Sequence, residues 1–167
     1  MTKRTVSVKW LTANDACEPQ IELFRATFGK SVRVTKSSLL RAAEAGLDLL
    51  WFASYNDLWP EVSEINGRLA AAINSIWERY EVDLGPIYNQ RQEEYNVVWE
   101  RFYTRKNGDV CSIPDSECDR EFGSVDAKYN PLLAPILLRA DAEIQLAKIP
   151  FYTEAAGVIW KALKDRS

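Results

Sequence analysis

In WERYEVDLGPIYNQRQEEYNVVWERFY, residues 77–103, large side chains recur every eleven residues. Two such series are Trp77, Tyr88 and Trp99, and Tyr80, Arg91 and Phe102. Eleven residues make about three helical turns, so each series stays on one side of a straight helix. The pattern predicts a long helix from residue 61 to about residue 103. Pro86 is expected to break or kink it, because proline lacks an amide donor.

A second copy of part of this stretch predicts a partner helix. Segment 80–87, YEVDLGPI, aligns with segment 129–136, YNPLLAPI, through a shared Tyr, Leu, Pro and Ile. Two such segments joined by a loop are expected to fold back as an antiparallel pair. The expected loop is 104–124, which is rich in turn-forming residues and, at that length, either mobile or functional. After Pro150, a last amphipathic helix is expected from about Tyr152 to Leu163.

Residues 1–58 predict a small helical head. Residues 5–11 alternate weakly, and we expect them to form an extended lead-in because no second strand is evident to pair with them. Asp15 followed three residues later by Glu18 has the spacing of a capping box, which predicts the start of a helix. Gly29 is expected to close that helix, since glycine accepts the backbone conformation of a helix end.

The rest of the head predicts two more helices. Thr35 is expected to cap the second helix, and Gly46 is expected to end it. A third short helix is expected over residues 47–53. The predicted fold class is therefore all-α, with an N-terminal helical head over 1–58 followed by long antiparallel helices over 59–167, or with both parts merged in one compact domain.

The composition is that of an ordinary globular protein, with 47% apolar and 27% charged residues. No apolar run approaches the roughly 20 residues that span a bilayer, and nothing at the start resembles a secretion signal. The three cysteines are an odd, scattered set, which favours reduced thiols over disulfides. We therefore expect a soluble cytoplasmic protein with no membrane partner.

Catalytic signatures are scarce in this chain. It contains no histidine, which removes the commonest general base and the commonest zinc ligand. Cys111 and Cys118 lie seven residues apart, which does not match a zinc site. The fragment Phe28-Gly29-Lys30-Ser31 gives only the end of a phosphate loop, and we interpret it as a helix end. We expect no enzyme activity, no cofactor and no metal; an enzyme relying on Tyr and carboxylates is the alternative.

Two aromatic-rich segments are candidate partner-binding surfaces. The first comprises Trp51, Phe52, Tyr55 and Trp59. Its rings either contact a partner or pack between the head and the long helices, and the sequence leaves both interpretations open. The second comprises Arg101, Tyr103, Arg105 and Lys106, in which aromatic and basic groups mix as nucleic-acid contacts require. The alternative for this second segment is a helix end with cations near its negative pole.

The N-terminal segment also carries a family resemblance. The residues concerned are Trp10-Leu11, Asn14, Ala16-Cys17, the pair Phe24 and Phe28, and Gly46-Leu47 before Trp51. This pattern resembles an N-terminal module of small phage and prophage proteins of unknown function, which continue into imperfect eleven-residue helical repeats. The resemblance covers roughly residues 1–55. It implies a mobile-element origin and carries no catalytic residues across.

The expected function is that of a phage or mobile-element accessory protein. Such a protein would bind a host protein or ribonucleoprotein complex in the host cytoplasm and inhibit or redirect it, as an anti-CRISPR-like inhibitor does. The first alternative is a structural helical protein that self-associates through its eleven-residue series, so that the chain is either a monomer or a homodimer. The second alternative is a weak nucleic-acid-binding module.

Overall fold

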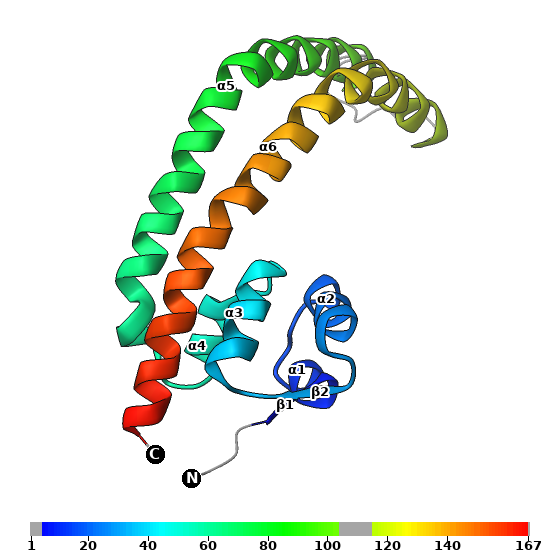
Figure 1. Cartoon of the computed structure of the whole chain (residues 1–167). Coiled ribbons are helices and arrows are strands. Elements are labelled where there is room, and N and C mark those ends of the chain that lie inside the picture. Colours follow the sequence, from blue (N-terminus) through cyan, green and yellow to red (C-terminus); the bar gives the residue numbers. More distant parts are fainter. Residues whose placement is uncertain (1–4, 104–114, 167) are drawn as a thin grey trace. The chain divides into compact units, whose positions relative to one another are not determined.

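The computed structural model describes residues 5–103 and 115–166, and nearly all of its regular elements are helices (Figure 1). In chain order the elements are β1 Thr5–Ser7, α1 Val8–Ala13, α2 Glu18–Phe28, β2 Ser31–Arg33, α3 Lys36–Glu44, α4 Leu49–Ser54, α5 Trp59–Tyr103 and α6 Asp115–Asp165. The expected all-α class, with a small head followed by long helices, is confirmed.

The chain divides into two compact units. Unit 1 comprises Met1–Asn74 and Ile144–Ser167, and unit 2 comprises Ser75–Glu143. Helices α5 and α6 both pass through this division, so the first turns of α5 and the last turns of α6 belong to the same unit as the head. The division does not coincide with the expected boundary after residue 58, because the head packs onto those turns and shares their core.

A short antiparallel sheet opens the head, where the sequence suggested an unpaired lead-in. Strand β1 pairs with β2 so that Val6 lies opposite Val32. The expectation for residues 5–11 was therefore wrong, because a partner strand of only three residues leaves no alternation to detect. The remainder of that segment is helix α1, whose N-cap Ser7 accepts a hydrogen bond from the amide of Trp10 at 3.1 Å.

Side-chain caps fix the start of α3 but not that of α2. The predicted Thr35 cap is confirmed as a full capping box: Thr35 Oγ1 accepts from the Ser38 amide at 3.1 Å, and Ser38 Oγ accepts from the Thr35 amide at 2.8 Å. The box expected at Asp15 and Glu18 was wrong. Cys17 is the N-cap residue of α2 and makes no side-chain cap, while Asp15 lies in the turn before it with a φ of 58°.

Glycines end two helices of the head, as expected. Gly29 follows α2 with a φ of 75°, and Gly46 follows α3 with a φ of 82°. Both values lie in the region that residues with a Cβ rarely adopt, so glycine allows the chain to leave the helix there without strain. The first of these turns leads directly into β2.

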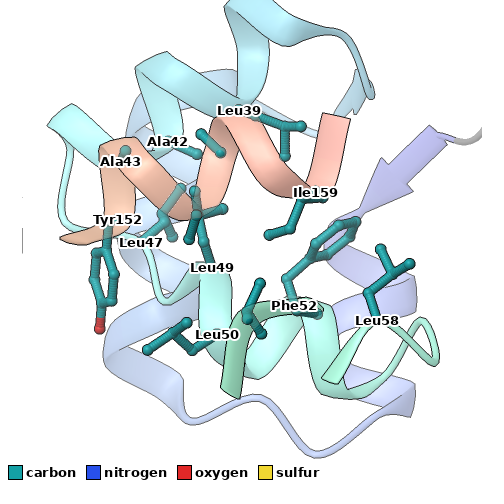
Figure 2. Packing of buried hydrophobic residues seen from close by; sticks show 14 of the residues in the cluster. Leu39, Ala42, Ala43, Leu47, Leu49, Leu50, Phe52, Leu58, Tyr152 and Ile159 are labelled. Carbon is teal, nitrogen blue, oxygen red and sulfur yellow. The ribbon is translucent and has the colours of Figure 1, made fainter. Parts of the chain in front are cut away.

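The core of unit 1 joins the head to both long helices. Figure 2 shows Leu39 and Phe52 of the head in one cluster with Leu58 and with Ile159 of α6. Leu58, Val62 and Ile159 are the largest fully buried side chains among the described residues. Burial of each such side chain stabilises the fold by about 1.5–3 kcal/mol. The first turns of α5 and the last turns of α6 are therefore needed to complete the core of the head.

Unit 2 is the antiparallel helical pair that the sequence predicted. Arg79 pairs with Glu143 toward one end, and Arg101 pairs with Glu121 toward the other, so the two segments run in opposite directions. Two apolar clusters lie between the segments: Leu84, Leu133 and Ile136, and then Val98, Phe102, Val125 and Tyr129. These contacts fix the register of the pair.

The eleven-residue series occupy two different sides of α5 in unit 2. Phe102 is buried against α6, and Tyr80 and Arg91 of the same series are half-buried. The other series is exposed: Trp77, Tyr88 and Trp99 have relative accessibilities of 39%, 41% and 48%. The spacing thus identified shared sides of a helix correctly without indicating which side is buried.

Helix α6 extends further than the sequence predicted. The expected loop 104–124 was wrong in its second half, because α6 begins at Asp115; residues 104–114 lie outside the described residues. The separate last helix from Tyr152 to Leu163 was also wrong, because α6 continues to Asp165 through three prolines, Pro131, Pro135 and Pro150. Pro86 likewise lies inside α5. A proline removes one helical donor and clashes with the preceding turn, which costs about 3 kcal/mol. The buried side chains that recur along α5 and α6 offset this cost.

Helices α5 and α6 are 45 and 51 residues long. Across residues 5–103 and 115–166, however, no helix combines length with enough apolar character to cross a membrane.

Candidate functional site

The first predicted aromatic segment lies in unit 1, on α4 and the turn into α5. Phe52 is buried in the core, and Trp51 is partly buried against it. Tyr55 and Trp59 have relative accessibilities of 46% and 43%. The four rings therefore differ in exposure. Phe52 packs in the core of the head, whereas Tyr55 and Trp59 present nearly half of their surface to solvent.

Trp51 connects the exposed rings to the core. Its ring centroid lies 4.7 Å from that of Tyr55 and 5.8 Å from that of Trp10. Tilted and edge-on aromatic pairs at such distances stabilise by about 0.5–1.5 kcal/mol beyond the area that they bury. Because Trp51 and Tyr55 are four residues apart on one side of the chain, this contact holds the exposed Tyr55 ring in place.

Asp48 fixes the start of α4 and so the position of Trp51. Its carboxylate Oδ1 accepts hydrogen bonds from the amides of Leu50 at 3.0 Å and Trp51 at 2.9 Å. The amide of Asp48 in turn donates to Oε1 of Gln20 at 2.8 Å, which ties α4 to α2. A helix of six residues depends on such anchors, because its own hydrogen bonds do not stabilise it in isolation.

Tyr152 of α6 lies beside the same carboxylate. The residue is only 4% exposed, and it lines the same cleft as Asp48. Burial, and after it the charge and the hydrogen bond of Asp48, raise the pKa of Tyr152 well above its ordinary value. The phenol therefore stays protonated and is able to donate to Asp48. This arrangement positions α4 and does not supply a general base.

The turn between α4 and α5 places Trp59. Asp57 has a φ of 55°, a left-handed conformation that aspartate tolerates better than most residues. The Leu58 amide then donates to the carbonyl of Ala53 at 3.0 Å, and the Leu58 side chain is fully buried. Trp59, the first residue of α5, follows directly after this anchor, so its exposed ring stands on a fixed backbone.

A cleft of about 320 Å³ lies beside these rings. Its apolar lining is Leu50, Trp51, Trp59, Leu69 and Ile73, and its polar lining is Asp48, Ser54, Asn66, Lys148 and Tyr152. Every one of these residues belongs to unit 1. Pockets of roughly 300–1,000 Å³ with apolar walls and a few polar groups are typical of ligand-binding sites. This cleft has room for one or two side chains of a partner.

The second predicted segment belongs to unit 2 and is described only in part. Arg101 is exposed on α5, and its guanidinium binds Glu121 of α6 at 2.6 Å. Tyr103 is the last residue of α5, and Arg105 and Lys106 lie outside the described residues. The described part offers one basic group that a carboxylate already neutralises, which favours the helix-end interpretation over a nucleic-acid contact.

The sequence did not indicate Asn66, Lys148 or Tyr152 as site residues. They lie on the two long helices, far along the chain from α4. Lys148 and Tyr152 are four residues apart, which identifies a shared helix side. That spacing does not say what the side contacts, so only the packing of unit 1 assigns these residues to the cleft.

The described residues offer little for metal chemistry. Within residues 5–103 and 115–166, no group of three or more His, Cys, Asp or Glu side chains is placed to hold a metal ion. Cys17 is exposed and Cys118 is half-buried, and both are free thiols. Comparison of the chain with protein-family models, with curated proteins and with solved structures gave no match.

Proposed function

We propose that this chain is a protein-binding protein and that its partner contacts the Trp59 surface, which comprises Tyr55, Trp59 and the cleft beside them. The observation that carries this proposal is the exposure of Tyr55 and Trp59, 46% and 43%, on a backbone held by buried anchors. Trp and Tyr on a fixed backbone are favoured interface anchors, because they bury a large area and lose little conformational entropy on binding.

The lining of the cleft indicates the chemistry of the partner. Its apolar wall suits an aliphatic or aromatic side chain. Lys148 forms no ion pair with any other residue in 5–103 or 115–166. An Asp or Glu of the partner would therefore gain a charge-assisted hydrogen bond there. The carboxylate of Asp48 is already engaged by two amides, so it offers less to a basic partner.

The resemblance to phage and prophage proteins suggests the source of the partner. In line with it, the proposed partner is a protein complex of a bacterial host, and binding inhibits or redirects that complex, as an anti-CRISPR-like inhibitor does. The Trp59 surface supports the binding part of this proposal, and the resemblance of residues 1–55 supports its origin.

Self-association is the second candidate function. It is favoured by the exposed series Trp77, Tyr88 and Trp99 on α5 of unit 2, with relative accessibilities of 39%, 41% and 48%. A helix that presents large rings every eleven residues offers a nearly straight stripe, which a second copy of the same stripe can cover.

One pair of matched variants separates the two candidates. Trp59→Ala and Trp77→Ala remove the same side chain at accessibilities of 43% and 39%, in different units. The protein bound from a bacterial host lysate is first identified by affinity capture and mass spectrometry, and its dissociation constant is then measured with purified components. We expect Trp59→Ala to weaken binding by about 30-fold or more, equivalent to about 2 kcal/mol, and Trp77→Ala to leave it unchanged.

The same variants test self-association by light scattering. A dimer of the native protein that becomes monomeric in Trp77→Ala supports the second candidate. Unchanged affinity of Trp59→Ala for the purified partner, with an unchanged far-UV circular dichroism spectrum, would reject the Trp59 surface.

A further inference from the structure

The head of unit 1 contains a second cavity, of about 230 Å³, which is partly open to solvent and shares Asp48 and Trp51 with the cleft. Its walls come from both short strands and from helices α1 to α4, and they include Leu11, Phe24, Leu39, Ala42 and Phe52. Protein interiors are normally packed with few voids larger than a water molecule. A recess of this size, lined mostly by apolar side chains, is therefore unusual in a small head and is large enough to hold a small molecule.

The polar groups around the cavity are largely engaged with each other. The Asp48 amide donates to Gln20 Oε1 at 2.8 Å, and Ser38 Oγ donates to the carbonyl of Arg33 at 2.9 Å. Asp15 and Cys17 also line the cavity and are exposed, and the half-buried Trp51 adds an indole N–H. The interior thus offers apolar contact and few free hydrogen-bonding groups, and water gains little there because it needs two to four polar partners.

The charges of the lining select further among ligands. The described residues that line the cavity include two carboxylates, those of Asp15 and Asp48, and neither Lys nor Arg. A ligand with a negative charge would meet like charges and find no cation to pair with. The rings of Phe24, Phe28 and Phe52 instead favour a ring-bearing apolar molecule.

We propose that this cavity is a binding site for a small, uncharged, apolar molecule about the size of one substituted ring. An apolar cavity of about 150 Å³ lined by Leu, Ile and Phe is known to stay dry and to bind benzene, so 230 Å³ accommodates a ring with a short substituent. This site shares Asp48 and Trp51 with the cleft of the Trp59 surface, but its other lining residues differ and it does not depend on the proposed partner.

Toluene and benzoate are matched probes for the site, because both are six-membered rings with one carbon substituent and only benzoate is charged. Toluene should shift the methyl NMR signals of the lining leucines Leu11, Leu39, Leu47 and Leu49. The buried leucines Leu58, Leu69 and Leu163, which belong to the same core but do not line the cavity, should keep their signals. Benzoate at the same concentration should shift none of them.

The melting temperature gives a second readout. Toluene at about ten times its dissociation constant should raise it by on the order of 5 °C. Ala42→Leu fills the cavity from α3, and it should abolish both the methyl shifts and the rise in melting temperature. Ala26→Leu makes the same change on an exposed site of α2 outside the lining, and it should preserve both.

Three results would overturn the proposal: toluene shifts equally large at Leu58 and Leu69, equal binding of benzoate, or retained toluene binding in a folded Ala42→Leu variant. If Ala42→Leu does not fold, the toluene titration of the unsubstituted protein still decides, because methyl shifts confined to the lining leucines support the site and their absence rejects it.

Discussion

Replacement of Asp48 by alanine should lower the free energy of unfolding by about 2–4 kcal/mol. The Asp48 carboxylate accepts hydrogen bonds from the amides of Leu50 and Trp51 at 3.0 and 2.9 Å, and loss of an N-cap costs about 1 kcal/mol. The change also removes the acceptor that lies beside the hydroxyl of Tyr152, a residue that is only 4% exposed. A buried donor with no partner costs about 1–3 kcal/mol, which completes the expected sum.

Urea unfolding followed by circular dichroism measures this cost, and a double-mutant cycle with Tyr152→Phe assigns it. Tyr152→Phe alone removes one hydrogen bond and should cost about 1 kcal/mol. In a Tyr152→Phe background no hydroxyl is left without a partner. The loss of unfolding free energy caused by Asp48→Ala should therefore be smaller there by about 1 kcal/mol or more. Asp48→Asn is the matched control, because asparagine is as good an N-cap as aspartate and keeps an acceptor oxygen for Tyr152.

Two outcomes would refute this reasoning. A coupling energy within about 0.5 kcal/mol of zero would mean that Asp48 and Tyr152 do not share a hydrogen bond in solution. An equal cost of Asp48→Asn and Asp48→Ala would mean that the negative charge, and not the cap, stabilises α4.

Alkaline pH should destabilise unit 1 through Tyr152, whose pKa is raised in the folded state. The contribution of Tyr152 to the free energy of unfolding is complete below its unfolded pKa of about 10. It is lost as the pH rises toward the raised pKa. Urea midpoints measured above pH 10 should therefore fall more steeply in the native protein than in Tyr152→Phe, and parallel curves would contradict this. Leu58→Ala should cost about 2–5 kcal/mol because Leu58 is fully buried, whereas Leu146→Ala in the same unit, 68% exposed, should change the unfolding free energy by less than about 0.5 kcal/mol. Thr35→Ala should cost about 1 kcal/mol by removing the capping box of α3, and Thr35→Ser, measured beside it, should cost little.

Short-range signals predicted much of this fold correctly. Thr35, Gly29 and Gly46 act within one helical turn, so the residues themselves carry the information about where α2 and α3 begin or end. The eleven-residue spacing indicated a long helix, and the second copy of segment 80–87 at residues 129–136 indicated its antiparallel partner. The features that were missed depend on distant contacts: β1 pairs with a strand of three residues, and α6 continues through three prolines while it buries side chains from Val125 to Leu163.

The candidate site was predictable to a smaller degree. The sequence predicted a partner-binding segment with four rings, those of Trp51, Phe52, Tyr55 and Trp59. It did not indicate which of them are exposed, since all four are large rings in one short segment. Burial of Phe52 and exposure of Trp59 follow from where α5 and α6 pass, which no local pattern records. The contribution of Lys148 to the cleft has the same origin.

The core of unit 1 joins segments that the ribosome makes at different times. Leu58 and Val62 are synthesised before residues 75–143, and Tyr152 and Ile159 after them. At about 5–20 residues per second, that intervening stretch takes about 3–14 s to translate. Throughout this interval the nascent head exposes the apolar surface that the end of α6 later covers. Translational pausing within residues 75–143 would prolong that exposure, so codon choice in this stretch affects the yield of folded protein and its demand for chaperones.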